Sequence, residues 1–173
     1  TLQVAARYPA ALLTLVDGSA EMVALTRHRL EERAPRQAEA ATFITNWFEA
    51  VDFADGSFDL VTSAIALHHV ADKTPLYRQV HRWLKPGGRF CFADQLRMQD
   101  PRSQAHHWAE FLAFWRRPGN VSEAEIVELL AHSEAHDHYE TLADQFALLR
   151  TAGFHDLDAP WRDGFWAVIT ATA

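Results

Sequence analysis

Short apolar segments alternate with helical patterns along most of this chain. Strand-like apolar runs cover residues 11–16, 41–45, 58–63 and 89–93, and helical patterns cover residues 1–8, 20–33 and 75–84. Strands that are joined through helices run parallel, so the alternation predicts a parallel sheet with helices on both faces. Because 49% of the 173 residues are apolar, the chain can bury one substantial core, which predicts a single compact domain.

The alternation of strands and helices is interrupted at residues 96–138, and the last two predicted strands have no helix between them. Residues 96–138 are rich in Trp, Phe and His and predict helices over 108–115 and 122–133, with Ser122 and Glu125 spaced as a capping box. After a helix over 142–151, two strands over 156–161 and 165–172 are joined by so short a link that they must be antiparallel. We therefore interpret residues 96–138 as a helical insertion.

Charge and cysteine content limit the partners and the compartment. The net charge is −7 and the basic residues are scattered, which argues against duplex nucleic acid or a membrane surface as the main partner. The chain has no apolar run of ~18 residues, the length that a membrane-spanning helix needs. The single cysteine, Cys91, cannot pair within the chain, which is consistent with a reducing, cytoplasmic location. Whether the chain forms a homodimer is left open.

An acid ends the first predicted strand, in the stretch LTLVDGSAEM (residues 13–22). In open parallel sheets, ligands bind at the carboxyl ends of the strands, where an acid can accept hydrogen bonds from both hydroxyls of a ribose. Asp17 is in that position. The alternative is that Asp17 caps the helix that begins near Ser19 or Ala20.

Four stretches in this order resemble the class I S-adenosylmethionine-dependent methyltransferases. They are LVDGSAEMVALTRHRL, FADGSFDLVTSAIALHHV, VHRWLKPGGRF and LLRTAGFHDLDAPWRDGFWAVITA. The resemblance implies a doubly wound, mostly parallel seven-stranded α/β sheet of the Rossmann-like type with an antiparallel C-terminal strand. It also implies that the first strand and its glycine-rich loop precede Thr1. Residues 1–173 would then be one domain that is incomplete at its N-terminus, with a helical lid at 96–138.

The resemblance implies S-adenosyl-L-methionine as the cofactor and assigns residues to it. Asp17 would hold the ribose hydroxyls, and Gly18 and Met22 would line the adenine side. Ser63 and Ala64 would pass close to the amino-acid part of the cofactor.

The adenine amino group is usually bound by an acid after the third strand, and here the chain departs from the family. The sequence reads TNWFEAVDF, so Asn46 is the nearest candidate, with an amide oxygen that can accept the same bond. Trp47 would supply the backbone donor and apolar packing. The alternative is that Trp47 belongs to the core.

Methyl transfer to a nucleophile depends mainly on positioning and on excluding water. If the acceptor must lose a proton, His68 or His69 can take it, because an imidazole titrates near neutrality. The alternative, which we favour, is that this pair shapes the loop.

Further histidines gather in the insertion, at positions 106, 107, 132, 136 and 138. His132 and His136 are spaced to share a helix face, and Asp137 is adjacent. Because no HExxH motif is present, we expect no metal ion there.

The insertion also carries an aromatic face, formed by Trp108, Phe111, Phe114 and Trp115. A lid buries part of such a face over the acceptor, so we assign Trp108, Trp115 and Arg116 to a small-molecule substrate, with the arginine orienting an anionic acceptor. Trp161 is a further candidate. The alternatives are that the rings form ordinary core and that the arginine faces solvent or acidic surface.

Three functions remain open from sequence. The leading one is methylation of a small molecule. The second keeps the cofactor but modifies S-adenosylmethionine itself for later use in tRNA wobble modification, which would need an arginine that contacts a carboxylated cofactor. The third is a degenerate, non-catalytic domain. A nicotinamide oxidoreductase, which also places an acid after its second strand, is more distant.

Overall fold

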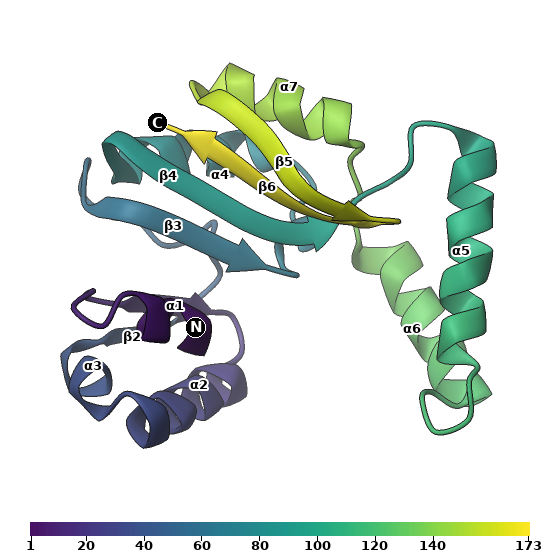
Figure 1. The fold of residues 1–173 in the computed structure, drawn as a ribbon, viewed down its shortest axis with the longest axis horizontal. Helices are drawn as coiled ribbons and strands as arrows, with labels where there is room; N and C mark the ends of the chain where they lie inside the picture. The colour runs from purple at the N-terminus through teal and green to yellow at the C-terminus, as the bar shows by residue number, and fades with distance from the viewer. The chain divides into compact units, whose positions relative to one another are not determined.

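The six strands of the chain form two sheets, each in its own unit of the fold (Figure 1). The computed structural model describes residues 1–173 and divides them into units at 1–52 and 53–173. The first sheet has two strands and the second has four. The prediction of a single domain over 1–173 concerns how the units join and stays a prediction.

The first unit pairs two short parallel strands with three helices. Its elements are α1 (Leu2–Arg7), β1 (Thr14–Asp17), α2 (Ala20–Arg33), α3 (Pro35–Ala40) and β2 (Thr42–Thr45). Ala5, Leu30 and Ala38 form its buried core. Helix α3 was not predicted, and Pro35 at its first turn explains it, because proline presets the helical φ and gives up no hydrogen bond there. Asp17 is the last residue of β1 and is paired in register with Thr45 of β2.

The second unit holds four strands in the order β3-β4-β6-β5. Its elements are β3 (Phe58–Ala64), the 3₁₀ helix η1 (Leu67–His69), α4 (Lys73–Trp83), β4 (Leu84–Gln95), α5 (Pro101–Trp115), α6 (Glu123–His136), α7 (Leu142–Ala152), β5 (His155–Asp163) and β6 (Trp166–Thr172). Strands β3 and β4 are parallel, and β6 is antiparallel to both β4 and β5. The predicted antiparallel C-terminal strand and the α/β class are thus confirmed.

The core of the second unit is aromatic. Phe90 and Phe92 alternate with less buried residues along β4, and both rings are 1% exposed. The Tyr77 ring on α4 packs 5.8 Å from Phe90, and the Phe154 ring also lies 5.8 Å from it. The Tyr77 hydroxyl donates a 2.6 Å hydrogen bond to Gln145 Oε1, which joins α4 to α7, its neighbour in Figure 1. The sequence pattern that predicted a buried strand at 89–93 is therefore confirmed.

Helix ends follow the predicted chemistry with one exception. The capping box of α6 is formed, because Glu125 N donates to Ser122 Oγ and Ser122 N donates to the Glu125 carboxylate. The exception is α4, which Asp72 caps by accepting from Thr74 N at 2.9 Å. A carboxylate caps as well as a hydroxyl, so the helix begins two residues earlier than predicted.

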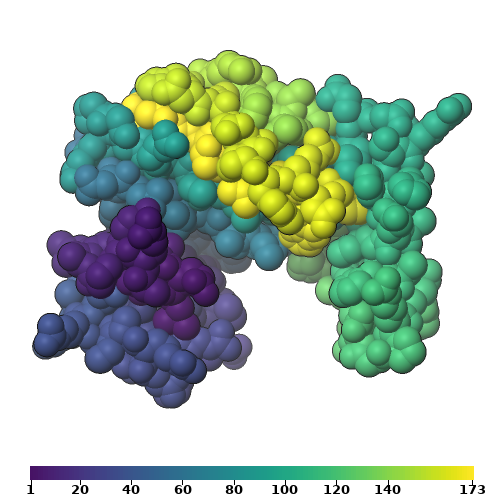
Figure 2. Space-filling view, in the orientation of Figure 1, coloured from purple at the N-terminus to yellow at the C-terminus, as the bar shows by residue number.

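The insertion folds as the predicted helices, α5 and α6. The aromatic face of α5 packs on the turn between β5 and β6, where the Trp108 and Phe111 rings lie 5.6 and 6.1 Å from that of Phe165. Figure 2 shows atoms of α5, in teal, meeting those of this hairpin, in yellow. No residue of α5 is fully buried. No helix in the structure combines the length and the apolar character that crossing a bilayer requires.

The buried hydrogen bond between α4 and α7 generates a stability prediction. Tyr77→Phe removes the donor and leaves Gln145 Oε1 buried without it, so the free energy of unfolding should fall by about 1–3 kcal/mol. Urea denaturation measures this. Tyr8→Phe is the matched control, because Tyr8 is 51% exposed, and it should change little. Equal losses in the two variants would contradict the assignment.

Candidate functional site

Asp17 is exposed at the carboxyl end of β1, and one of its two carboxylate oxygens accepts a hydrogen bond from a neighbouring residue. Its Oδ1 accepts a 2.9 Å hydrogen bond from Ser19 N. Ser19 is the residue that caps α2, through a 3.3 Å bond from Met22 N to its hydroxyl. The alternative that Asp17 is the cap is therefore wrong. Asp17 Oδ2 accepts no hydrogen bond in the structure, which leaves one carboxylate oxygen for a ligand.

Trp47 and Met22 are two further residues of the first unit that were predicted to bind the cofactor. The Trp47 indole follows β2 and lies so close to Gly18 that a Cβ there would be 3.0 Å from two of its ring carbons. Trp47 is nevertheless 67% exposed and Met22 is 48% exposed. The alternative that Trp47 belongs to the core is wrong. The first unit therefore presents an exposed acid at the end of β1, an exposed indole after β2 and a half-exposed thioether in the first turn of α2.

Asn46 joins this group through its backbone. Asn46 N donates to Asp17 O at 3.0 Å, which continues the pairing of the two strands by one residue. Its side-chain Oδ1 accepts from Trp47 N at 2.9 Å. The acceptor and the donor that the resemblance assigned to adenine thus bond each other. The amide oxygen has a second lone pair, whereas the Trp47 N–H must exchange its partner before it can bind a ligand.

In the second unit, strand β3 ends in strained backbone. Ser63 and Ala64 are its last residues, and Ile65 follows with φ +54°. A β-branched residue in the left-handed region is costly, and such strain gathers at functional sites. The strain is held by a 2.8 Å bond from Ile65 N to Ala93 O on β4. Nothing in the sequence signalled it, because isoleucine is the last residue expected to adopt this conformation.

The loop after β3 brings a buried histidine to a buried carboxylate. His68 N donates to Asp94 Oδ2 at 3.0 Å, and His68 Nδ1 lies 2.5 Å from Asp94 Oδ1. Burial by itself lowers the pKa of His68, but the bond to Asp94 and the charges of Asp94 and Asp137 outweigh it and raise the pKa above its usual value. His69 differs, because its side chain is 46% exposed while that of His68 is 9% exposed.

Asp137, directly after α6, completes this cluster. Its Oδ1 lies 3.0 Å from His69 Nδ1 and 3.9 Å from His68 Nε2, and its Oδ2 accepts from the Tyr139 hydroxyl at 2.5 Å. Asp94 and Asp137 were not assigned to a site from sequence, since they are 26 and 69 residues beyond His68 along the chain. The His132 and His136 rings do lie near each other, 4.8 Å apart as their spacing predicts.

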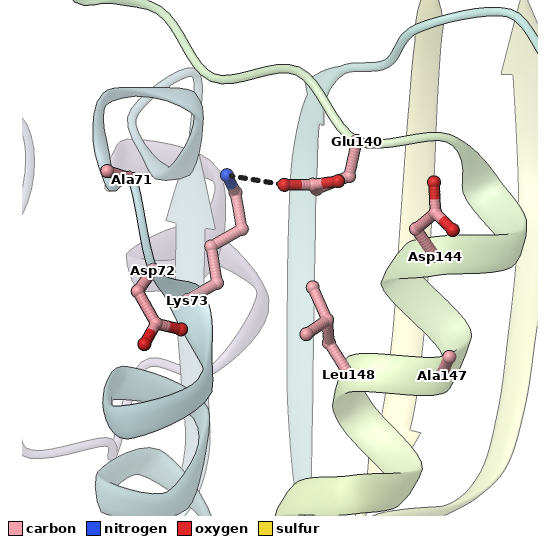
Figure 3. A pocket seen from close by; sticks show the side chains of 7 residues that line it. All are labelled: Ala71, Asp72, Lys73, Glu140, Asp144, Ala147 and Leu148. Atoms are coloured by element: carbon pink, nitrogen blue, oxygen red, sulfur yellow. Dashed lines mark ion pairs between the residues drawn. The ribbon is translucent and has the colours of Figure 1, made fainter.

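Lys73 joins the C-terminal end of the helical insertion to the loop that follows β3. It is 1% exposed, and its Nζ donates to Val70 O at 2.8 Å and to His138 O at 2.7 Å, with Glu140 Oε1 at 3.8 Å. Burial lowers the pKa of Lys73, and the nearby Glu140 offsets only part of this. Figure 3 shows this ion pair between Lys73 and Glu140, which come from opposite sides of an open pocket of about 380 Å³. None of the residues predicted for cofactor, substrate or catalysis lines that pocket.

The predicted substrate residues have different surroundings in the second unit. Trp108 packs on Phe165, as described above, and the Trp115 ring lies 4.4 Å from that of Phe111. Arg116 Nε donates to Glu123 Oε1 at 2.8 Å, so the guanidinium is already paired with an acid at the start of α6. Trp161, on β5, is 51% exposed.

The His68–Asp94 pair generates a titration prediction. Asp94→Asn removes the charge of Asp94 and its charged hydrogen bond, the two largest effects that raise the pKa of His68, so the pKa should fall below that of the wild type when it is followed by NMR in metal-free buffer. Because the folded pKa is above 6.5, protonated His68 stabilises the fold fully below about pH 6.5, and this stabilisation is lost as the pH rises through the raised value. Asp156→Asn, beside exposed His155, is the matched control. A His68 titration that Asp94→Asn leaves unchanged would contradict the pairing.

The amino-acid sequence has recognisable relatives. The chain is similar to an uncharacterized methyltransferase, YcgJ, of Bacillus subtilis (strain 168), with 32% identity over 113 residues, which cover 65% of this chain and 43% of that protein. It is 36% identical over 89 residues to the ubiquinone/menaquinone biosynthesis C-methyltransferase UbiE of Geotalea daltonii, covering 51% of this chain and 37% of that one. The chain thus spans less than half the length of these curated relatives.

The fold has solved counterparts as well. Phosphoethanolamine N-methyltransferase 2 of Haemonchus contortus is similar in structure, with a TM-score of 0.69 and 16% identity over 98% of this chain and 45% of that one. The likeness shows the Rossmann-like fold. In sequence, residues 1–92, more than half of the chain, match the family model described as a methyltransferase domain. The chain therefore belongs to the class I S-adenosylmethionine-dependent methyltransferase family.

Proposed function

We propose that the protein transfers a methyl group from S-adenosylmethionine to a small-molecule acceptor. One observation carries the proposal: the family match over residues 1–92 includes Asp17, which ends β1 as an exposed acid with a free carboxylate oxygen. An acid at the carboxyl end of a strand suits the vicinal hydroxyls of a ribose. Because the chain spans less than half of its curated relatives, the activity is proposed for the protein that contains it.

The residues of the first unit fit the adenosine part of the cofactor. Asp17 Oδ2 would accept from a ribose hydroxyl, and the exposed faces of Trp47 and Met22 would pack on the adenine. Asn46 would accept from the adenine amino group through its second lone pair. In the second unit, Ser63 and Ala64 would lie beside the amino-acid part. The cofactor supplies an electrophilic methyl group on a sulfonium.

Relatives support a small-molecule acceptor. UbiE is named for C-methylation in quinone biosynthesis, and the H. contortus structure was solved with phosphomonomethylethanolamine and S-adenosylhomocysteine. These two acceptors differ in the atom that is methylated and in polarity. The proposal is therefore limited to the class of small molecules, and the aromatic residues Trp108, Trp115 and Trp161 are proposed to contact it.

His69 is the better placed of the two histidines to accept a proton from an acceptor. Its side chain is half-exposed, and buried Asp137 lies beside its Nδ1 and can orient the ring. His68 has one ring nitrogen engaged by Asp94 and is buried, so we assign it the role of positioning the loop. Most of the rate would come from orientation and from excluding water, as for other displacements of this kind.

A reaction that modifies the cofactor itself is not favoured. It would need a free arginine for a carboxylated cofactor. The candidates in the insertion are Arg116 and Arg117. Arg116 is paired with Glu123, and the Arg117 guanidinium lies over the Phe114 ring, 5.4 Å from its centroid.

Binding of S-adenosylhomocysteine to the full-length protein tests the proposal. We expect micromolar binding by isothermal titration calorimetry, and Asp17→Ala should weaken it by about 1–3 kcal/mol through the loss of hydrogen bonds to a charged group. Glu21→Ala is the matched control, since it removes an exposed acid from the first turn of α2 and leaves the strand end intact. Absence of binding by a folded full-length protein would refute the enzyme proposal and favour a degenerate domain.

Trp47 provides an independent optical readout. If adenine stacks on its exposed indole, S-adenosylhomocysteine should change the tryptophan emission of the protein, and Trp47→Phe should abolish most of that change while leaving the fold intact. Trp161→Phe, which removes another half-exposed tryptophan, should preserve it. A change that persists in Trp47→Phe would show that adenine binds elsewhere.

A further inference from the structure

Three ligand atoms from distant parts of the chain converge in the second unit. A ring nitrogen of His68, a ring nitrogen of His69 and a carboxylate oxygen of Asp137 all lie within 4.8 Å of one another. The two histidines come from η1, after β3, and the acid comes from the residue that ends α6. We refer to His68, His69 and Asp137 as the ligand cluster.

The strongest sign of a missing ligand is one oxygen of Asp137. The Asp137 side chain is only 7% exposed, and its Oδ1 is buried and accepts no hydrogen bond. The nearest ring nitrogen, Nδ1 of His69, is 3.0 Å away but does not meet hydrogen-bond geometry. A buried carboxylate oxygen without a partner is costly, and a bound cation would satisfy it.

The second sign is the orientation of His68. Asp94, 2% exposed, accepts from both the backbone N and the ring Nδ1 of His68. When Nδ1 carries the proton, the lone pair is on Nε2, which is the nitrogen nearer to Asp137. A carboxylate that fixes the tautomer of a histidine from behind is the usual outer partner of a metal-bound imidazole.

Charge within the cluster points in the same direction. The Asp137 carboxylate accepts from the Tyr139 hydroxyl through Oδ2 and faces the two imidazoles of the cluster through Oδ1. Asp94 adds a second buried acid. Such charges are stable in an interior only when they are paired or coordinate a metal ion, and two neutral imidazoles with a carboxylate form a common zinc donor set.

We propose that His68, His69 and Asp137 bind one divalent transition-metal ion of the zinc type, with Asp94 holding His68 in place. Three protein ligands leave a fourth position open to water or to a small molecule. The ion would tie the loop after β3 to the end of the helical insertion. Because it would use the lone pair of His69, metal binding and proton acceptance by His69 would exclude each other.

Cobalt and zinc titrations of the full-length protein, stripped of metal by a chelator, test this inference at pH 8 without any cofactor. One equivalent of Co²⁺ should give the visible absorption bands of a tetrahedral site, and Zn²⁺ should displace it. Asp137→Asn, which keeps the shape of the side chain, should weaken binding by about tenfold or more, and Asp94→Asn by about 10–100-fold, as losses of outer partners do. Circular dichroism would verify that each variant is folded.

The chain offers a matched control on α5. His106 and His107 are also adjacent histidines, with ring nitrogens 3.6 and 3.2 Å from Glu110, but this group is more exposed. The double variant His106→Ala, His107→Ala should retain full affinity. No cobalt spectrum, equal affinity in Asp137→Asn, or binding lost only in the double variant would each overturn the proposal. Since these titrations omit the cofactor, their failure is distinguishable from a failure of S-adenosylhomocysteine binding.

Discussion

The organisation of the second unit depends on one buried carboxylate, that of Asp94. It sits near the end of β4, on the face where Phe90 and Phe92 also point into the core, and it accepts two hydrogen bonds from His68. A charged group this deeply buried is tolerated only when its bonds are satisfied, so the loop after β3 has little freedom to be elsewhere. The strained backbone at Ile65 is held within the same loop.

This loop is also where the helical insertion is fastened. His138 N donates to His68 O at 2.7 Å, and the buried ammonium of Lys73 donates to His138 O. Further out, the insertion depends on aromatic packing between α5 and Phe165. The helical insertion is thus joined to the rest of the second unit by buried polar contacts at one end and by aromatic packing along α5.

In the first unit, hydrogen bonds between residues close in the sequence hold the backbone around Asp17. Asp17, Ser19 and Met22 bond one another within six residues, and one further residue of strand pairing brings Asn46 beside Asp17. Short-range hydrogen bonds of this kind can be anticipated from sequence, and the position of Asp17 at the end of a strand was predicted. What sequence could not reveal is that Asn46 Oδ1 and Trp47 N bond each other, because rotamers depend on surrounding contacts.

The sequence by itself determined the order of the strands and of the helices other than α3, the antiparallel C-terminal hairpin, the capping box at Ser122 and the acid that ends β1. Hydrophobic periodicity and capping act over a few residues, so a local pattern records them. Tertiary structure alone decided that Asp94 and Asp137 meet His68. Those three residues are far apart along the chain, and no local pattern records which of several acids reaches a given histidine. The strained Ile65 and the pairing of Arg116 with Glu123 were decided in the same way, by contacts that exist only once the chain has folded.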